Sequence, residues 1–397
     1  MRWLIGFVFY KIAFGLMSIL LPLFITRVSQ GNILVWGIFT ASATFLAIPF
    51  AFLWGYLCDA TQRYRFFILM SFATVTLLIF LFTLTTNLFI LGVLYALIVV
   101  FEVAHEPSKN VLIAESYSHE EWKKAFANYE GWTELGWVIG LLLGFLLAAL
   151  NIGNTTMLLV SVLFSLGSFL ASAILVMDPA LIFERGLVSM EKSISVVQRG
   201  AMLLSRADDN PRALEGFKNE NPFALCAGLV LFALATSTFF TPLPLFFADK
   251  LSLDTSIVFM LFLINSSSCF LGYLRIQRNV ERVDGNKSIK RISVLRSVLV
   301  ILPLLIGIVP LLGIAVSIVT LVGMGLAYAF YSVAVLSLSM EVIPQGKAGL
   351  FTALIGTGAA VGCFVGPLIA ENVGFEFTFV TSAVFFVFSF IAFQEFS

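Results

Sequence analysis

Long apolar runs separated by short polar gaps extend along nearly the whole chain of 397 residues. A helix needs about 20 mostly apolar residues to cross a bilayer. By this measure the sequence predicts an all-α polytopic membrane protein with twelve membrane-spanning helices. Their expected ranges are 3–24, 33–57, 66–86, 88–114, 127–150, 154–177, 223–247, 256–276, 289–309, 312–340, 347–370 and 375–394.

One long polar stretch, residues 178–222, divides these spans into six and six. We therefore expect an amino-terminal six-helix bundle over 1–177, a linker over 178–222 and a carboxy-terminal six-helix bundle over 223–397. Apolar residues recur at helical spacing within the linker, which favours an amphipathic helix lying on the inner leaflet. A merely solvated linker is the alternative interpretation.

The composition agrees with a membrane protein. Hydrophobic residues make up 60% of the chain and charged residues 12%, whereas soluble domains carry about 25% charged residues. The formal net charge of zero lacks the basic excess that nucleic-acid binding needs. The two histidines, His105 and His119, and four scattered cysteines have no zinc-ligand spacing, so we expect neither a metal site nor an organic cofactor.

The basic residues predict the orientation in the membrane. Nineteen of the 23 Lys and Arg residues fall in gaps or span ends on one side, and only Arg27 and Lys250 fall on the other. Lys11 and Lys109 lie within spans. Such a bias over short loops marks the cytoplasmic side. The sequence therefore predicts a multi-pass protein of the cell membrane with a cytoplasmic linker and both termini in the cytoplasm.

The two halves repeat the same landmarks in the same order. Glycines four residues apart occur in the fifth and eleventh predicted spans, at Gly136, Gly140 and Gly144 and again at Gly358, Gly362 and Gly366. Small residues at this spacing allow close helix packing. Parallel repeats of this kind are typical of transporters.

The segment after the second predicted span reads Gly55-Tyr-Leu-Cys-Asp59-Ala-Thr-Gln-Arg63-Tyr-Arg65. With the repeats, this segment resembles the signature of the major facilitator superfamily, and the resemblance covers essentially the whole chain. It implies two pseudo-symmetric six-helix bundles and a gate-stabilising role for Gly55, Asp59, Arg63 and Arg65. We expect Gly55 to allow a close helix approach. The segment departs from the family pattern at Ala60 and Gln62.

The fifth predicted span also resembles the antiporter signature of that family. Gly131, Gly140 and Gly144 match its spacing, while Phe145 replaces its proline. This resemblance favours export of a solute in exchange for protons, and uptake by proton symport is the runner-up.

Four ionisable residues in the fourth predicted span share one helical face, because their offsets are three, four and seven residues. They are Glu102, His105, Glu106 and Lys109. Each charge near the bilayer centre costs about 2.5–3.5 kcal/mol, so this face must contact protein or water. Pro107 within it is expected to kink the helix.

Lys11 in the first span lies at a matching depth, which predicts an ion pair with Glu102 or with Glu106. Glu134 in the fifth span is a candidate partner of Lys109. Two interpretations remain for these charges. Either they are static salt bridges, or one carboxylate takes up and releases a proton during transport. The surplus of acidic groups favours proton coupling, with a proton gradient as the energy source.

The carboxy-terminal half offers no charge deep in its predicted spans, but it does offer polar and aromatic side chains. With Ser18 of the first span, the expected cavity residues are Thr238, Thr241, Asn265, Tyr328 and Tyr331. A cavity that is charged on one side and lined by hydroxyls and aromatics on the other fits a small amphipathic organic solute. We expect a monomeric secondary transporter whose only partners are this solute and the lipid bilayer.

Two other classes of protein are weaker candidates. A membrane-embedded enzyme would need a nucleophile–base pair, a metal cluster or a phosphate-binding loop, and the sequence has no motif for any of these. A transporter-like sensor would bind a ligand without moving it.

Overall fold

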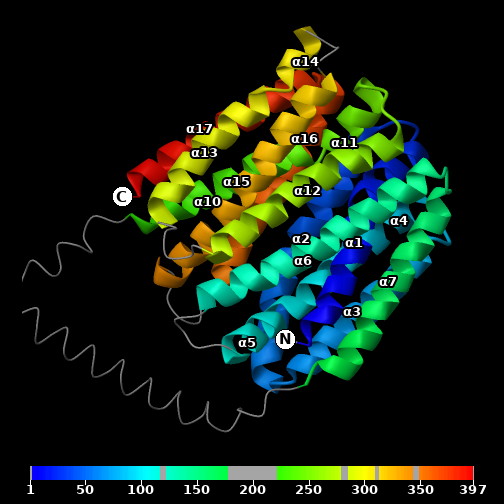
Figure 1. The fold of residues 1–397 in the computed structure, drawn as a ribbon, viewed down its shortest axis with the longest axis vertical. Coiled ribbons are helices and arrows are strands. Elements are labelled where there is room, and N and C mark those ends of the chain that lie inside the picture. Colours follow the sequence, from blue (N-terminus) through cyan, green and yellow to red (C-terminus); the bar gives the residue numbers. More distant parts are fainter. Residues whose placement is uncertain are drawn as a thin grey trace, which may run out of the picture.

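The structure is a computed structural model that describes residues 2–116, 122–177, 221–278, 285–308, 313–342 and 348–396. Within these ranges all regular structure is helical, and the long helices lie side by side in one elongated bundle (Figure 1). Eleven of the described helices are long and apolar enough to cross a membrane. The predicted amphipathic helix of the linker falls outside the described residues.

The amino-terminal half consists of α1 (Leu4–Val28), α2 (Ile33–Thr61), α3 (Tyr64–Phe82), α4 (Leu88–Glu102), η1 (Val103–His105), α5 (Glu106–Ser116), α6 (Trp122–Ala149) and α7 (Asn154–Leu175). The carboxy-terminal half consists of α10 (Pro222–Phe240), α11 (Leu243–Leu245), η3 (Phe246–Lys250), α12 (Thr255–Arg278), α13 (Gly285–Ile301), α14 (Leu304–Ile308), α15 (Gly313–Val342), α16 (Ala348–Asn372) and α17 (Phe375–Glu395).

Prolines interrupt three of the predicted spans. The predicted seventh span is divided into α10 and α11 at Pro242. In the fourth span, η1 is a 3₁₀ turn between α4 and α5, and the Glu106 N–H bonds to the carbonyl of Val103. Pro107 follows directly and has no N–H to continue the α-helical pattern. The predicted ninth span is divided into α13 and α14 at Pro303, so it is not the continuous helix that the apolar run suggested.

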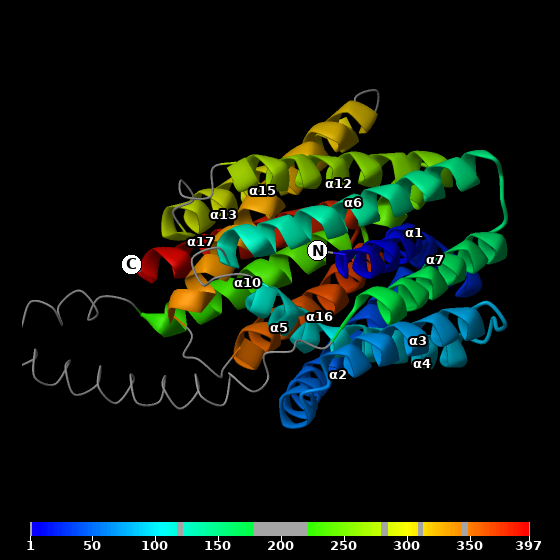
Figure 2. The same ribbon diagram turned by 60° about the horizontal axis from the view of Figure 1, so that its bottom comes forward.

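The glycine repeats explain how each half is packed. Gly140 of α6 lies against the Ile12 carbonyl of α1, and Gly362 of α16 lies against the Leu234 carbonyl of α10. A methyl group at either glycine would overlap the facing backbone. The fifth membrane-spanning helix of each half, α6 or α16, therefore packs directly on the first, α1 or α10, as duplicated halves require (Figure 2).

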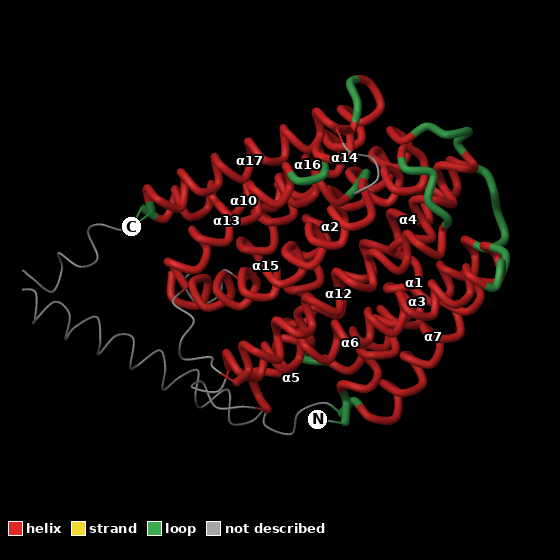
Figure 3. Tube along the Cα trace, turned by 45° about the horizontal axis from the view of Figure 1, so that its top comes forward, coloured by secondary structure: helices red, strands yellow, loops and turns green. Residues whose placement is uncertain are grey.

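Two helix pairs join the halves along the bundle, α2 with α16 and α6 with α12 (Figure 3). We call the end where residues 29–32, 83–87 and 150–153 connect helices the hairpin end, and the end where α1 starts and α17 stops the terminal end. At the hairpin end, Glu371 of α16 accepts a hydrogen bond of 2.9 Å from the Ile33 N–H of α2.

The outer surface of the bundle is apolar. Phe45, Phe89 and Ile174 are among many large hydrophobic side chains that are more than 60% exposed. A soluble monomer rarely exposes apolar surface on this scale. These side chains fit a bundle whose outside faces lipid.

Candidate functional site

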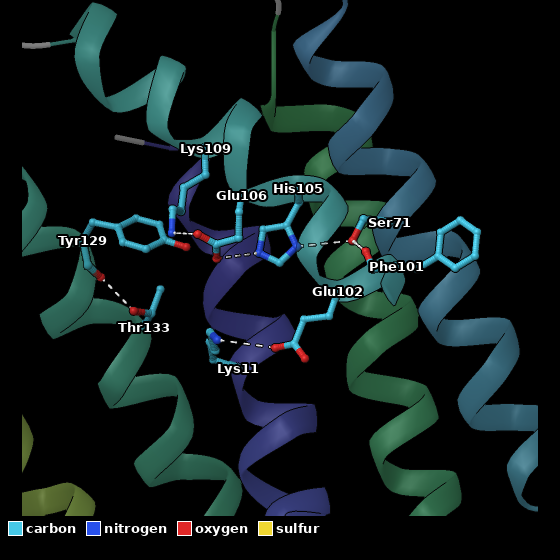
Figure 4. Close-up of polar contacts among 9 residues, drawn as sticks. All are labelled: Lys11, Ser71, Phe101, Glu102, His105, Glu106, Lys109, Tyr129 and Thr133. Atoms are coloured by element: carbon cyan, nitrogen blue, oxygen red, sulfur yellow. Dashed lines mark hydrogen bonds and ion pairs between the residues drawn. The ribbon is translucent and has the colours of Figure 1, made fainter. Parts of the chain in front are cut away.

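The charged residues of the fourth span meet α1 and α6 inside the amino-terminal half (Figure 4). Lys11 Nζ of α1 lies 4.0 Å from Glu102 Oε1 at the end of α4. Lys11 is seven residues into α1, which places it about 10 Å along that helix from its start. Both side chains are about one quarter exposed, at 24% and 27%. The pair is therefore a loose contact that water can reach.

Glu106 has different partners. Its carboxylate forms an ion pair with Lys109 on the next turn, and its other oxygen lies 3.5 Å from His105 Nε2. The Lys109 ammonium also lies 5.1 Å from the centre of the Tyr129 ring on α6. Of the two partners that the sequence left open for Lys11, the structure selects Glu102.

His105 is a packed core residue. Its side chain is 1% exposed, and its ring lies 5.2–5.6 Å, centre to centre, from those of Phe7, Tyr10 and Phe72. The Ser71 hydroxyl donates its proton to the Phe101 carbonyl at 2.7 Å and lies 3.3 Å from His105 Nδ1. The contacts with Ser71 and the three rings hold the imidazole in one orientation.

Two glutamates of α6 complete the charged cluster. The charge of Glu130 interacts with that of Lys109, a role that the sequence assigned to Glu134. Glu134 instead interacts with the Ser266 side chain of α12, across the boundary between the halves. Sequence reasoning missed Glu130. With Glu102 and Glu106, the cluster holds four carboxylates against the two ammonium groups of Lys11 and Lys109.

The signature segment lies exposed at the terminal end. Arg65 donates a hydrogen bond of 2.6 Å to the Ala173 carbonyl of α7, and Arg63 precedes the first turn of α3. Among the described residues none forms an ion pair or a hydrogen bond with Asp59. A methyl group on Gly55 would meet no atom within 4 Å, so the expected close helix approach at Gly55 is wrong for this conformation.

Most of the predicted cavity residues are occupied by contacts within the protein. Their polar atoms bond to backbone carbonyls or a thiol, or their rings stack in the core. These contacts are Ser18 to Gly15 O, Thr238 to Leu234 O, Thr241 to Cys363 Sγ, Asn265 to Leu321 O, and Tyr331 stacked on Phe232. Tyr328 differs, because its side chain is 44% exposed.

Arg296 corrects the expectation that the carboxy-terminal half has no deep charge. It lies in the middle of α13 and is 1% exposed. Its guanidinium donates hydrogen bonds to Thr236 Oγ1 at 2.9 Å and to the Met324 carbonyl at 3.2 Å. The sequence count had grouped Arg296 with the basic residues at the membrane surface.

Comparisons with known proteins agree with this architecture. The model of the Major Facilitator Superfamily matches residues 3–367. No match to a curated protein was found. The structure of the human organic anion transporter MFSD10 (TETRAN) is 15% identical with a TM-score of 0.69, and the alignment covers 99% of this chain and 98% of that one.

Two further solved structures share the fold. The nucleoside transporter NupG is 14% identical with a TM-score of 0.63, over 99% of this chain and 97% of that one. A D-xylose-proton symporter is 13% identical with a TM-score of 0.72, over 100% of this chain and 96% of that one. At these identities the likeness shows the fold alone.

Proposed function

Because the chain belongs to the major facilitator superfamily, and is therefore a multi-pass membrane transporter rather than an enzyme, we propose that it exchanges a small amphipathic organic solute for protons. The solved neighbours are named as transporters of organic anions, nucleosides and D-xylose, which are chemically different solutes. The solute class and the coupling must therefore be argued from the residues of this chain.

The observation that carries the proposal is the contact between Lys11 and Glu102. It joins α1 to α4 inside the amino-terminal half, it is long at 4.0 Å, and both side chains remain accessible. The pair of Glu106 and Lys109 is tighter, and its Lys109 side chain is buried. Of these two ion pairs, the one at Glu102 is the easier to open and re-form.

Protonation of Glu102 would remove the charge that attracts Lys11. A proton bound there would weaken the contact between α1 and α4 and release the ammonium group. The four carboxylates around two ammonium groups supply a second reason, because the cluster keeps surplus negative charge unless a proton or a cation binds. One proton at Glu102 would change both the local charge and a contact between helices.

Export is the direction we propose, since the glycine spacing of α6 resembles that of antiporters. Reconstituted vesicles with imposed pH gradients test it. A counterflow screen first identifies a transported solute. An acidic lumen should then drive accumulation of that solute, because protons leave as the solute enters. Accumulation driven by an acidic exterior would show symport instead, and ligand binding without flux would show a sensor.

A further inference from the structure

Arg296 is a charged group inside the carboxy-terminal bundle with no carboxylate beside it. Among the described residues it forms no ion pair, and its guanidinium is almost completely buried. A buried charge without a counter-ion is costly, and ionisable residues inside membrane helices usually face a partner or a transported ligand. A functional role for Arg296 would explain why the protein bears the cost of burying this charge.

The guanidinium of Arg296 has more N–H donors than its hydrogen bonds use. An arginine carries five N–H donors, and Arg296 uses one on Thr236 and one on the Met324 carbonyl. Its Nε is buried and has no hydrogen-bond partner among the described residues. The Nε–H and a neighbouring amino N–H of a guanidinium point the same way, which is the geometry that binds both oxygens of one carboxylate.

Three aromatic rings surround this guanidinium. The ring centres of Phe232, Tyr328 and Phe386 lie 5.1, 5.5 and 5.7 Å from its central carbon. Phe232 and Phe386 are buried, whereas Tyr328 is exposed. Tyr328 lies on α15, which also contacts α6 of the amino-terminal half. Tyr328 is the ring that can move to uncover Arg296.

We propose that Arg296 binds a carboxylate group of the transported solute, and that the Tyr328 ring moves aside to admit it. This inference rests on the proposed transport of an organic solute and narrows that solute to an organic carboxylate. The carboxylate would pair with the free donors of Arg296, while the apolar part of the solute would lie against the surrounding rings.

Thermal stabilisation of the purified full-length protein tests the binding. The probes are benzoate, 4-phenylbutyrate and indole-3-acetate, each compared with its uncharged primary amide. We expect at least one acid to raise the melting temperature of the wild type while its amide does not. Arg296→Gln should weaken that binding at least tenfold, and Arg296→Lys should weaken it as well, because an ammonium group lacks the planar fork.

The matched control is Arg275→Gln, because Arg275 is exposed at the end of α12 and should not affect binding. The melting temperature without ligand distinguishes this proposal from the alternative, in which Arg296 is a purely structural clamp that only holds the helices together. A clamp predicts that Arg296→Met melts well below the wild type, whereas an unpaired buried cation predicts an equal or higher melting temperature. Stabilisation by no acid, or equal stabilisation of Arg296→Gln, would overturn the proposal. Proton-driven transport of amines or neutral solutes would leave the proposed function standing while refuting this inference.

Discussion

The carboxylate of Glu371, near the end of α16, accepts a hydrogen bond from the backbone N–H of Ile33, the first residue of α2. The two residues belong to different halves and are 338 positions apart. A carboxylate at a helix N-terminus also interacts favourably with the helix dipole. This contact therefore links the two halves at the hairpin end of the bundle.

Glu371→Gln should open the hairpin end more often. A hydrogen bond to a charged group is stronger than one to a neutral group by about 1 kcal/mol, which corresponds to a shift of about fivefold in the ratio of open to closed forms. Distances between spin labels at Leu84 and Val373 measure this ratio. Glu376→Gln is the control, because Glu376 pairs with Lys250 of its own half at 3.4 Å. An identical distance distribution in Glu371→Gln and wild type would contradict the prediction.

Gly140→Ala and Gly362→Ala should destabilise the protein. The added methyl group would overlap the Ile12 carbonyl in one half and the Leu234 carbonyl in the other. Overpacking of this kind costs about 1–3 kcal/mol, so both variants should melt at a lower temperature. Gly153→Ala is the control, because a methyl group there meets no atom within 4 Å. Equal melting of all three variants would refute the close packing of α6 on α1 and of α16 on α10.

Asp59→Asn should slow transport without lowering the melting temperature. Asp59 is exposed and has no ion pair among the described residues, so its loss costs little in this conformation. Its role in the gate stays a prediction. We expect at least a tenfold loss of the exchange rate, with Glu395→Gln as the exposed control. An unchanged rate would remove Asp59 from the mechanism.

Orientation in the membrane is tested by labelling single cysteines in a cysteine-free background. Thr86 and Thr155 are exposed at the hairpin end, and Glu395 is exposed at the terminal end. If the basic residues mark the cytoplasmic side, an impermeant maleimide added outside intact cells should label positions 86 and 155 and should spare 395. The opposite pattern would place the termini outside.

The sequence predicted the helices well because a membrane span is a long and strong signal. The charged stripe of the fourth span was predictable for the same reason, since helical spacing puts Glu102 and Glu106 on one face. Which of these two glutamates pairs with Lys11 was not predictable. It depends on the 3₁₀ turn before Pro107, which sets the relative directions of α4 and α5.

Arg296 and Glu130 were missed for a related reason. Both follow basic or polar segments at the start of a span, where charges usually anchor a helix at the membrane surface. Arg296 nevertheless lies seven residues inside its predicted span, 289–309, about as deep as Lys11 lies in the first span. That depth was the signal from which the burial of Arg296 could have been predicted. The place of Glu130 in the cluster was harder to predict, because α6 begins at Trp122, five residues before its predicted start.

The central claim is that Glu102 carries the coupling proton, and Glu102→Gln in proteoliposomes tests it most directly. Glutamine keeps the size of the side chain but cannot take up a proton at neutral pH. Solute exchange without a pH gradient should persist, because exchange needs no net change of protonation. Accumulation driven by an imposed pH gradient should disappear. Glu106→Gln is the matched control, and because it leaves Lys109 without its ion-pair partner, it should lower the melting temperature while keeping proton-driven accumulation in the folded fraction. Accumulation by Glu102→Gln at the wild-type level would show that Glu102 is structural and would contradict the account.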